Sequence, residues 1–107
     1  MSDTFDTIRA LIAEGNVRIS EHGYDELADE GLLAKELIEA VETAEVIEDY
    51  PNYPKGPCFL VLHRTKDGRS VHAVWGLPSG HTNPAVLITA YVPDPKKWEP
   101  GFKRRRK

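Results

Sequence analysis

Hydrophobic residues in the first half of the chain recur every three or four positions, which is the spacing of an amphipathic helix. This spacing predicts helices over residues 2–14 and 33–43, each with an apolar stripe and a charged opposite side. Between them, Ser20 is a suitable N-cap for a further helix, which Gly31 ends. The tripeptide Val17–Ile19, apolar at both ends, predicts a short strand before that helix.

After residue 44 the helical period is lost, and segments rich in β-branched and aromatic residues follow. Clusters of proline and glycine separate them and predict loops over residues 51–57 and 78–84. The pattern predicts four strands, over residues 46–50, 58–65, 70–77 and 85–92. Helices followed by a meander of strands predict an α+β fold, in which two to three N-terminal helices pack on one antiparallel sheet of three to five strands.

The turn between the second and third of these strands has two compatible geometries. A two-residue turn at Asp67 and Gly68 places His63 directly opposite His72, with Cβ atoms about 5 Å apart. A three-residue loop with a bulge shifts the register, and His63 then faces Val71. Both turns suit the residues, and only the first pairs the two imidazoles.

Charge is distributed unevenly along the chain. Residues 1–50 contain 14 acidic and 3 basic residues, and residues 51–107 contain 3 acidic and 11 basic residues, for a formal net charge of −3. This asymmetry is typical of binding to a nucleic acid or a partner, but acidic helices beside a basic tail also produce it. The length suits one domain, which we place at residues 1–102, followed by a basic C-terminal tail at residues 103–107.

Composition excludes several classes of site. Cys58 is the only cysteine, so neither an intramolecular disulfide nor a cysteine-rich zinc site can form. No apolar stretch has the length of a membrane span, and the first residues lack the features of a signal peptide. We therefore expect a cytoplasmic protein with no membrane contact, no metal site and no other cofactor.

Four segments of the chain resemble a bacterial family known as domain of unknown function 4258. They are RISEHGYDEL around His22, LIEAVETAEVIEDY at residues 37–50, SVHAVWG around His72, and LITAYVPDPKKWEPGF at residues 87–102. The resemblance extends from Val17 to the end of the chain, and its last segment is the most specific part.

This family is similar to the RelE, ParE and MqsR toxins, whose fold packs two helices against a small antiparallel sheet. The resemblance implies a toxin-like ribonuclease that acts on RNA or at the ribosome, or an inactive relative of one. It also implies a cognate antitoxin of the zinc-finger type as a partner. Relatives carry an arginine-rich stretch before the second helix, where this chain has the acidic segment 25–30. That departure argues against contact between this helix and RNA.

Metal-free RNA cleavage needs a base for the 2′-hydroxyl proton, an acid for the leaving 5′-oxygen and cations for the phosphate. We predict His22 and His72 as acid and base, because imidazole titrates near neutral pH, and Arg64 as a phosphate ligand. His22 falls in the first turn of its helix, whose positive end favours a neutral imidazole. The resemblance adds Tyr91 as an acid or a stacking group. For each of these side chains, packing or local hydrogen bonding is the structural alternative.

Other basic residues predict where RNA would bind. Lys66 and Arg69 cluster at the hairpin with Arg64, where they either bind phosphate or only solubilise the turn. The basic tail is also predicted to follow an RNA backbone, through Lys103, Arg104, Arg105 and Arg106. Alternatively, it docks on an acidic antitoxin or on the acidic helices of this chain, or it stays solvated.

The sequence therefore predicts a metal-independent endoribonuclease of a toxin–antitoxin pair. One alternative is a non-catalytic module of the same fold that binds RNA, the ribosome or an antitoxin. Another is a structural partner whose basic half binds an acidic antitoxin and no nucleic acid.

Overall fold

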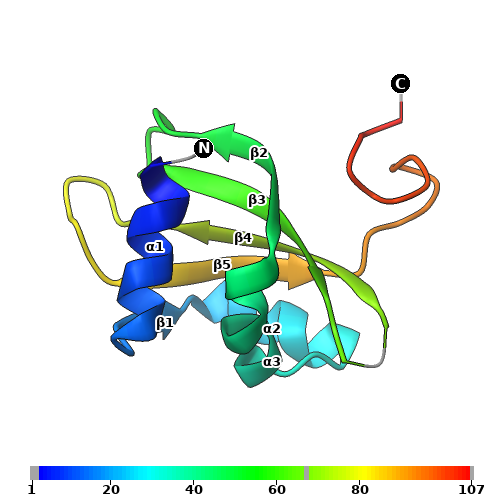
Figure 1. The fold of residues 1–107 in the computed structure, drawn as a ribbon, viewed down its shortest axis with the longest axis horizontal. Coiled ribbons are helices and arrows are strands. Elements are labelled where there is room, and N and C mark those ends of the chain that lie inside the picture. The colour runs from blue at the N-terminus through cyan, green and yellow to red at the C-terminus, as the bar shows by residue number, and fades with distance from the viewer. Residues whose placement is uncertain (1–2, 67, 107) are drawn as a thin grey trace.

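A five-stranded sheet with the strand order β1-β5-β4-β3-β2 forms the centre of the fold (Figure 1). We describe residues 3–66 and 68–106 of a computed structural model. The strands are β1 (Val17–Ile19), β2 (Glu45–Tyr50), β3 (Cys58–Arg64), β4 (Ser70–Gly76) and β5 (Ala85–Tyr91). Neighbouring strands are antiparallel except β1 and β5, which run parallel.

Three helices accompany the sheet: α1 (Asp3–Ala13), α2 (Glu21–Glu30) and α3 (Ala34–Ala40). A single 3₁₀ turn, Val41–Thr43, continues α3 and occupies the last part of the helix predicted over residues 33–43. The predicted α+β class, with N-terminal helices packed on one sheet, is confirmed. The parallel β1–β5 pair differs from the antiparallel sheet that the order of elements predicts. None of the helices described is long and apolar enough to cross a membrane.

The core lies between the helices and one face of the sheet. Because side chains alternate along a strand, every second residue of β3 and β4 points to this side. Phe59, Val71 and Trp75 are completely buried there, against Ile8 of α1 and Leu37 of α3. The opposite face, which we call the open face, carries Leu60, Leu62, His72, Val74 and Tyr91.

Helix α2 is tied closely to β5 by its N-cap, as the sequence predicts for Ser20. The Ser20 hydroxyl oxygen accepts a hydrogen bond from the Gly23 amide at 2.9 Å and donates one to the Ile88 carbonyl at 2.7 Å. A Cβ atom on Gly23 would lie 2.8 Å from the Leu87 carbonyl oxygen, so a larger residue would push the helix away. This contact fixes the first turn of α2, which contains His22, beside the end of the sheet.

The β3–β4 hairpin adopts the register of the three-residue loop. Thr65 and Arg69 close the loop through two hydrogen bonds, from the Thr65 amide to the Arg69 carbonyl at 2.9 Å and from the Arg69 amide to the Thr65 hydroxyl at 3.0 Å. Gly68 supplies the expected positive φ of 86°. His63 therefore pairs with Val71. The alternative register, in which two imidazoles oppose one another, is wrong; position 67 itself lies outside the described residues.

His63 is instead a core residue, with 1% of its surface exposed. Neither ring nitrogen makes a hydrogen bond of standard geometry within the described residues. Burial lowers the pKa of His63 to about 4, because the imidazolium loses its hydration, while the nearby Ala40 backbone acts weakly in the opposite direction. A neutral imidazole is therefore sealed between β3 and α3.

We predict that His63 makes the fold sensitive to acid. Its folded-state pKa of about 4 lies below its ordinary value of 6.5, so the unfolded chain binds the proton first as the pH falls. The free energy of unfolding is therefore at its full value above pH 6.5 as far as His63 is concerned. It falls by roughly 3 kcal/mol as the pH falls towards 4. Urea denaturation at several pH values measures this loss.

The matched controls are His63→Leu and His81→Leu, since His81 is an exposed histidine in the loop before β5. The free energy of unfolding of His63→Leu, taken relative to wild type, should rise by about 3 kcal/mol between pH 6.5 and 4. His81→Leu should follow wild type. A constant difference between wild type and His63→Leu across this range would contradict the burial account.

Candidate functional site

Beyond β5 the chain folds back as an ordered unit, residues 94–106, which we call the C-terminal segment (Figure 1). Asp94 starts a helical turn, in which the Lys97 and Trp98 amides donate to its carbonyl at 2.9 and 3.1 Å. A turn at residues 99–102 follows, and the Arg106 amide then donates to the Lys97 carbonyl at 2.8 Å. The segment is thus held together by its own backbone hydrogen bonds.

Ion pairs to strand β2 fasten this segment to the open face. The Arg105 guanidinium donates two hydrogen bonds to Glu48, at 2.8 and 3.1 Å, and lies 4.6 Å from the centre of the Trp98 ring. Lys103 forms an ion pair with Glu45 at 3.1 Å. Although these basic side chains are exposed, they are paired with acids of β2. Lys103 and Arg105 are therefore neither freely solvated nor docked on the acidic helices, the two alternatives considered for the tail within this chain.

His72 is the buried centre of the contact between the segment and the sheet. None of its surface is exposed, and the Trp98 ring lies 4.3 Å from its own, edge to face. Its Nε2 lies 2.7 Å from the Phe102 carbonyl oxygen, and its Nδ1 lies 3.3 Å from the Tyr91 hydroxyl. A carbonyl only accepts, so Nε2 must carry the proton. Nδ1 is then the acceptor, and the Tyr91 hydroxyl donates to it.

The protonation states around this contact follow from burial and charge. Burial lowers the pKa of His72, while the Phe102 carbonyl and the Glu48 charge oppose that shift. Burial also raises the pKa of the Tyr91 phenol. The hydrogen bonds from Arg105 hold the pKa of Glu48 below its usual range. At neutral pH, therefore, a neutral imidazole and a neutral phenol lie beside an ionised carboxylate–guanidinium pair.

Tyr91 and Arg105 form a wall between two hollows. The first, which we call the polar pocket, has a volume of about 510 Å³ and lies between the start of α2 and the C-terminal segment. Its polar lining includes His22, Glu26, Tyr91, Asp94, Lys97 and Arg105. The His22 side chain is 66% exposed, with Nε2 at 3.5 Å from Glu26. An accessible imidazole and a phenol thus meet two cationic side chains in one pocket.

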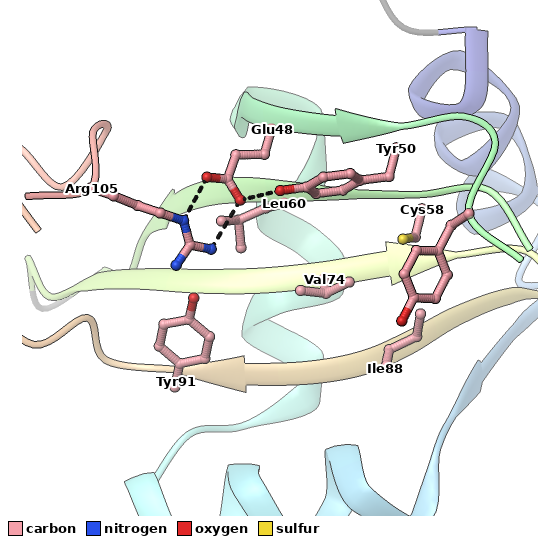
Figure 2. Close-up of a pocket in the computed structure, with 9 residues that line it drawn as sticks. Glu48, Tyr50, Cys58, Leu60, Val74, Ile88, Tyr91 and Arg105 are labelled. Atoms are coloured by element: carbon pink, nitrogen blue, oxygen red, sulfur yellow. Dashed lines mark hydrogen bonds and ion pairs between the residues drawn. The ribbon is translucent and has the colours of Figure 1, made fainter. Parts of the chain in front are cut away.

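The second hollow, which we call the aromatic pocket, lies on the open face and has a volume of about 260 Å³ (Figure 2). Its apolar lining consists of Tyr50, Tyr53, Cys58, Leu60, Val74 and Ile88. Glu48, Tyr91 and Arg105 border it on the side of the C-terminal segment. Figure 2 shows the Tyr50 hydroxyl on Glu48, a hydrogen bond of 2.8 Å that raises the pKa of this phenol.

The structure gathers some of the predicted site residues and separates others. His22, Tyr91 and Arg105 line the polar pocket, and His72 lies behind Tyr91. Arg64 does not line it; the residue lies at the hairpin end of β3, where Nη1 donates to the Ser70 hydroxyl at 3.2 Å.

The remaining predicted RNA ligands are dispersed. Lys66 lies near Glu36 and Glu39 of α3, and Arg69 donates to the Glu30 carbonyl at 3.4 Å. In the C-terminal segment, the Arg104 carbonyl accepts a hydrogen bond from the Glu99 amide at 2.8 Å. Arg106 donates a hydrogen bond from Nε to the Pro95 carbonyl at 2.7 Å. The predicted RNA ligands therefore do not form one continuous cationic surface.

Sequence reasoning missed Glu48 and Lys97 as members of the site. The acidic run at the end of β2 and the basic tail carry complementary charges, which was the one available signal for the Glu48–Arg105 pair. Lys97 falls within the specific final segment, but nothing in its spacing indicates a pocket. Within residues 3–66 and 68–106, no three His, Cys, Asp or Glu side chains cluster in a way that could hold a metal ion.

We predict that Glu48 and Arg105 stabilise the folded C-terminal segment by about 0.2–1 kcal/mol, the range measured for ion pairs at a protein surface. A double-mutant cycle with Glu48→Gln and Arg105→Gln measures this coupling, and 1 M salt should reduce it. Arg104→Gln is the matched control, because Arg104 is adjacent to Arg105 but belongs to neither the Arg105–Glu48 nor the Lys103–Glu45 ion pair. A coupling of zero at low salt would contradict the proposed attachment.

A family model with the description Domain of unknown function (DUF4258) matches residues 19–92, which include His22, Glu48, His72 and Tyr91. The matched range stops before the C-terminal segment. Neither the curated proteins nor the solved structures contain a significant match to this chain. Since the matched residues make up more than half of its length, the chain belongs to the family described as Domain of unknown function (DUF4258).

Proposed function

We propose that this protein is a toxin-like, metal-independent endoribonuclease, related in fold to the RelE, ParE and MqsR toxins. The observation that carries the proposal is the polar pocket, where an accessible imidazole and a phenol lie beside two cations. The phenol, Tyr91, is hydrogen-bonded to the buried neutral His72. Helices packed on a small, mainly antiparallel sheet support the relationship to these toxins.

The hydrogen bonds around His72 suggest how the 2′-hydroxyl is activated. Tyr91 accepts the 2′-hydroxyl proton as it passes its own proton to Nδ1 of His72. The Phe102 carbonyl and the nearby Glu48 carboxylate stabilise the imidazolium that forms. His72 is thus the final proton acceptor, and Tyr91 is the group that touches the substrate.

The remaining steps require an acid and positive charge. The 2′-oxygen attacks phosphorus, the bond to the 5′-oxygen breaks, and His22 donates its proton to that leaving oxygen. This role needs the imidazolium, for which Glu26 at 3.5 Å is a partner, and not the neutral form that the position at the helix start predicts. Lys97 and Arg105 stabilise the additional charge on the phosphate, the role that sequence analysis gives to Arg64. The products are a 2′,3′-cyclic phosphate and a 5′-hydroxyl end.

One observation favours a second candidate, a non-catalytic module that binds RNA, the ribosome or an antitoxin. Arg105 is already held by Glu48, and Glu26 and Asp94 add negative charge to the polar pocket. A phosphate must compete with these carboxylates. In this candidate RNA binds without being cut, or else the ribosome or a cognate antitoxin of the zinc-finger type covers the pocket.

We predict that the purified protein cleaves RNA equally well with and without EDTA. His22→Ala and Tyr91→Phe should each lower kcat/KM by about 10²–10⁴-fold, the usual contribution of a general acid or base. His81→Ala and Tyr24→Phe are matched controls, because both residues are exposed and lie outside the polar pocket. Quantified cleavage of a labelled RNA, with identification of the cyclic phosphate, provides the measurement.

Intact RNA after incubation with folded wild-type protein would exclude the enzyme and leave the binding module. Cleavage that disappears with EDTA would contradict the metal-independent mechanism. Equal loss of activity in His22→Ala and His81→Ala would show that His22 has no special role.

We also predict which arginine stabilises the phosphate. Arg105→Gln should lower kcat by at least about tenfold, because the charge at the polar pocket is lost, whereas Arg64→Gln should change kcat by less than about twofold. Steady-state cleavage kinetics of wild type and the two variants measure these changes in kcat. The reverse order would restore the role predicted for Arg64 from the sequence.

A further inference from the structure

The aromatic pocket has no role in the proposed proton transfers, yet it shares Tyr91 and Arg105 with the polar pocket. Two of its tyrosines are unusually accessible: Tyr50 is 44% exposed and Tyr53 is 51% exposed. Ile88, on the same lining, is 36% exposed. Large side chains are left accessible here around a concave surface, so they are available to contact a ligand.

We propose that the aromatic pocket binds an unpaired nucleobase of the RNA strand, next to the phosphate held at Arg105. This inference rests on the proposed function for its ligand class. Proteins that recognise single-stranded RNA splay out bases and stack them on aromatic side chains. Two exposed tyrosines beside a guanidinium provide both the stacking surface and the adjacent positive charge.

The size and chemistry of the lining fit a flat base with a polar edge. A volume of about 260 Å³ accommodates one base, and Leu60, Val74 and Ile88 form an apolar floor for its face. Glu48 lies at the border, and the Tyr50 hydroxyl and Arg105 hydrogen bonds fix the orientation of its carboxylate (Figure 2). A carboxylate oxygen accepts more than one hydrogen bond, so Glu48 can also accept from an N–H group on the edge of a base.

The position of the pocket gives the base a defined relation to the reacting phosphate. Arg105 and Tyr91 border both pockets, so a nucleotide with its phosphate in the polar pocket has its neighbouring base beside the aromatic pocket. Binding there would orient the strand for cleavage. Base stacking would then contribute to affinity without dependence on a continuous basic surface.

Binding is measured by fluorescence anisotropy with a labelled, mixed-sequence 2′-fluoro RNA dodecamer, which lacks the 2′-hydroxyl and resists cleavage. Tyr53→Ala should weaken binding about 5- to 150-fold, the range for loss of one stacked base. Tyr53→Phe should restore binding to within about twofold, because the ring is retained. Tyr24→Ala, which removes a tyrosine that is 60% exposed on α2, should bind as wild type does.

The salt dependence adds a second readout. The slope of log K against log salt concentration should be the same for Tyr53→Ala and wild type, since stacking releases no counterions. Wild-type affinity in Tyr53→Ala, or equal losses in Tyr53→Ala and Tyr24→Ala, would overturn the nucleobase site. So would a dimer of this chain that Tyr53→Ala dissociates, because a second copy would then occupy the pocket.

The two proposals fail in different ways. Tyr53-dependent binding of the dodecamer without cleavage of natural RNA would support the nucleobase site and exclude the enzyme. Cleavage of natural RNA with unchanged dodecamer binding by Tyr53→Ala would support the enzyme and exclude the nucleobase site.

Discussion

The hydrogen bond between His72 and the Phe102 carbonyl is the contact on which the site depends. It joins the middle of the sheet to the C-terminal segment, and it fixes which nitrogen of the imidazole carries the proton. Phe102 has a φ of 60°, which is unusual for a residue other than glycine and costs of order 1–3 kcal/mol. The surrounding turn and the ion pairs to β2 hold the carbonyl in place against that cost.

Two consequences follow from this one contact. Because Nε2 is occupied, Nδ1 faces Tyr91 as an acceptor, and the phenol is oriented between the two pockets. Because the segment is held against the sheet, Trp98 covers His72 and Arg105 is brought to the same wall. The acidic and basic halves of the chain are thereby joined inside the molecule, through Glu45 and Glu48. Part of the charge asymmetry that suggests an external partner is thus used within the fold, in the Lys103–Glu45 and Arg105–Glu48 pairs.

Sequence patterns predicted the fold better than they predicted the site. Helical spacing, the Ser20 cap and the Gly31 stop are local signals, and the structure confirms each of them. The parallel β1–β5 pair could not be predicted, because a three-residue strand carries no information about a partner nearly seventy residues away. The hairpin register depended on whether Thr65 or Lys66 closes the loop, and both suited the residues.

The candidate site was predicted in part. His22, His72 and Tyr91 were named from their chemistry and the family resemblance, and they lie near one another because Gly23 lets α2 approach β5. Arg64 was predicted as the phosphate ligand because arginine binds phosphate, but it lies at the hairpin end of β3. That Arg105 lines the polar pocket instead depends on how the C-terminal segment folds back, which is a tertiary contact that spacing along the chain does not encode.

The most direct measurement of the central contact is ¹⁵N NMR of the His72 side chain between pH 8 and 5. We predict one neutral tautomer, protonated at Nε2, which persists below the ordinary imidazole pKa of 6.5 because burial lowers the pKa of this group. A mixture of the two neutral tautomers, or an imidazolium that forms with an ordinary pKa, would contradict it.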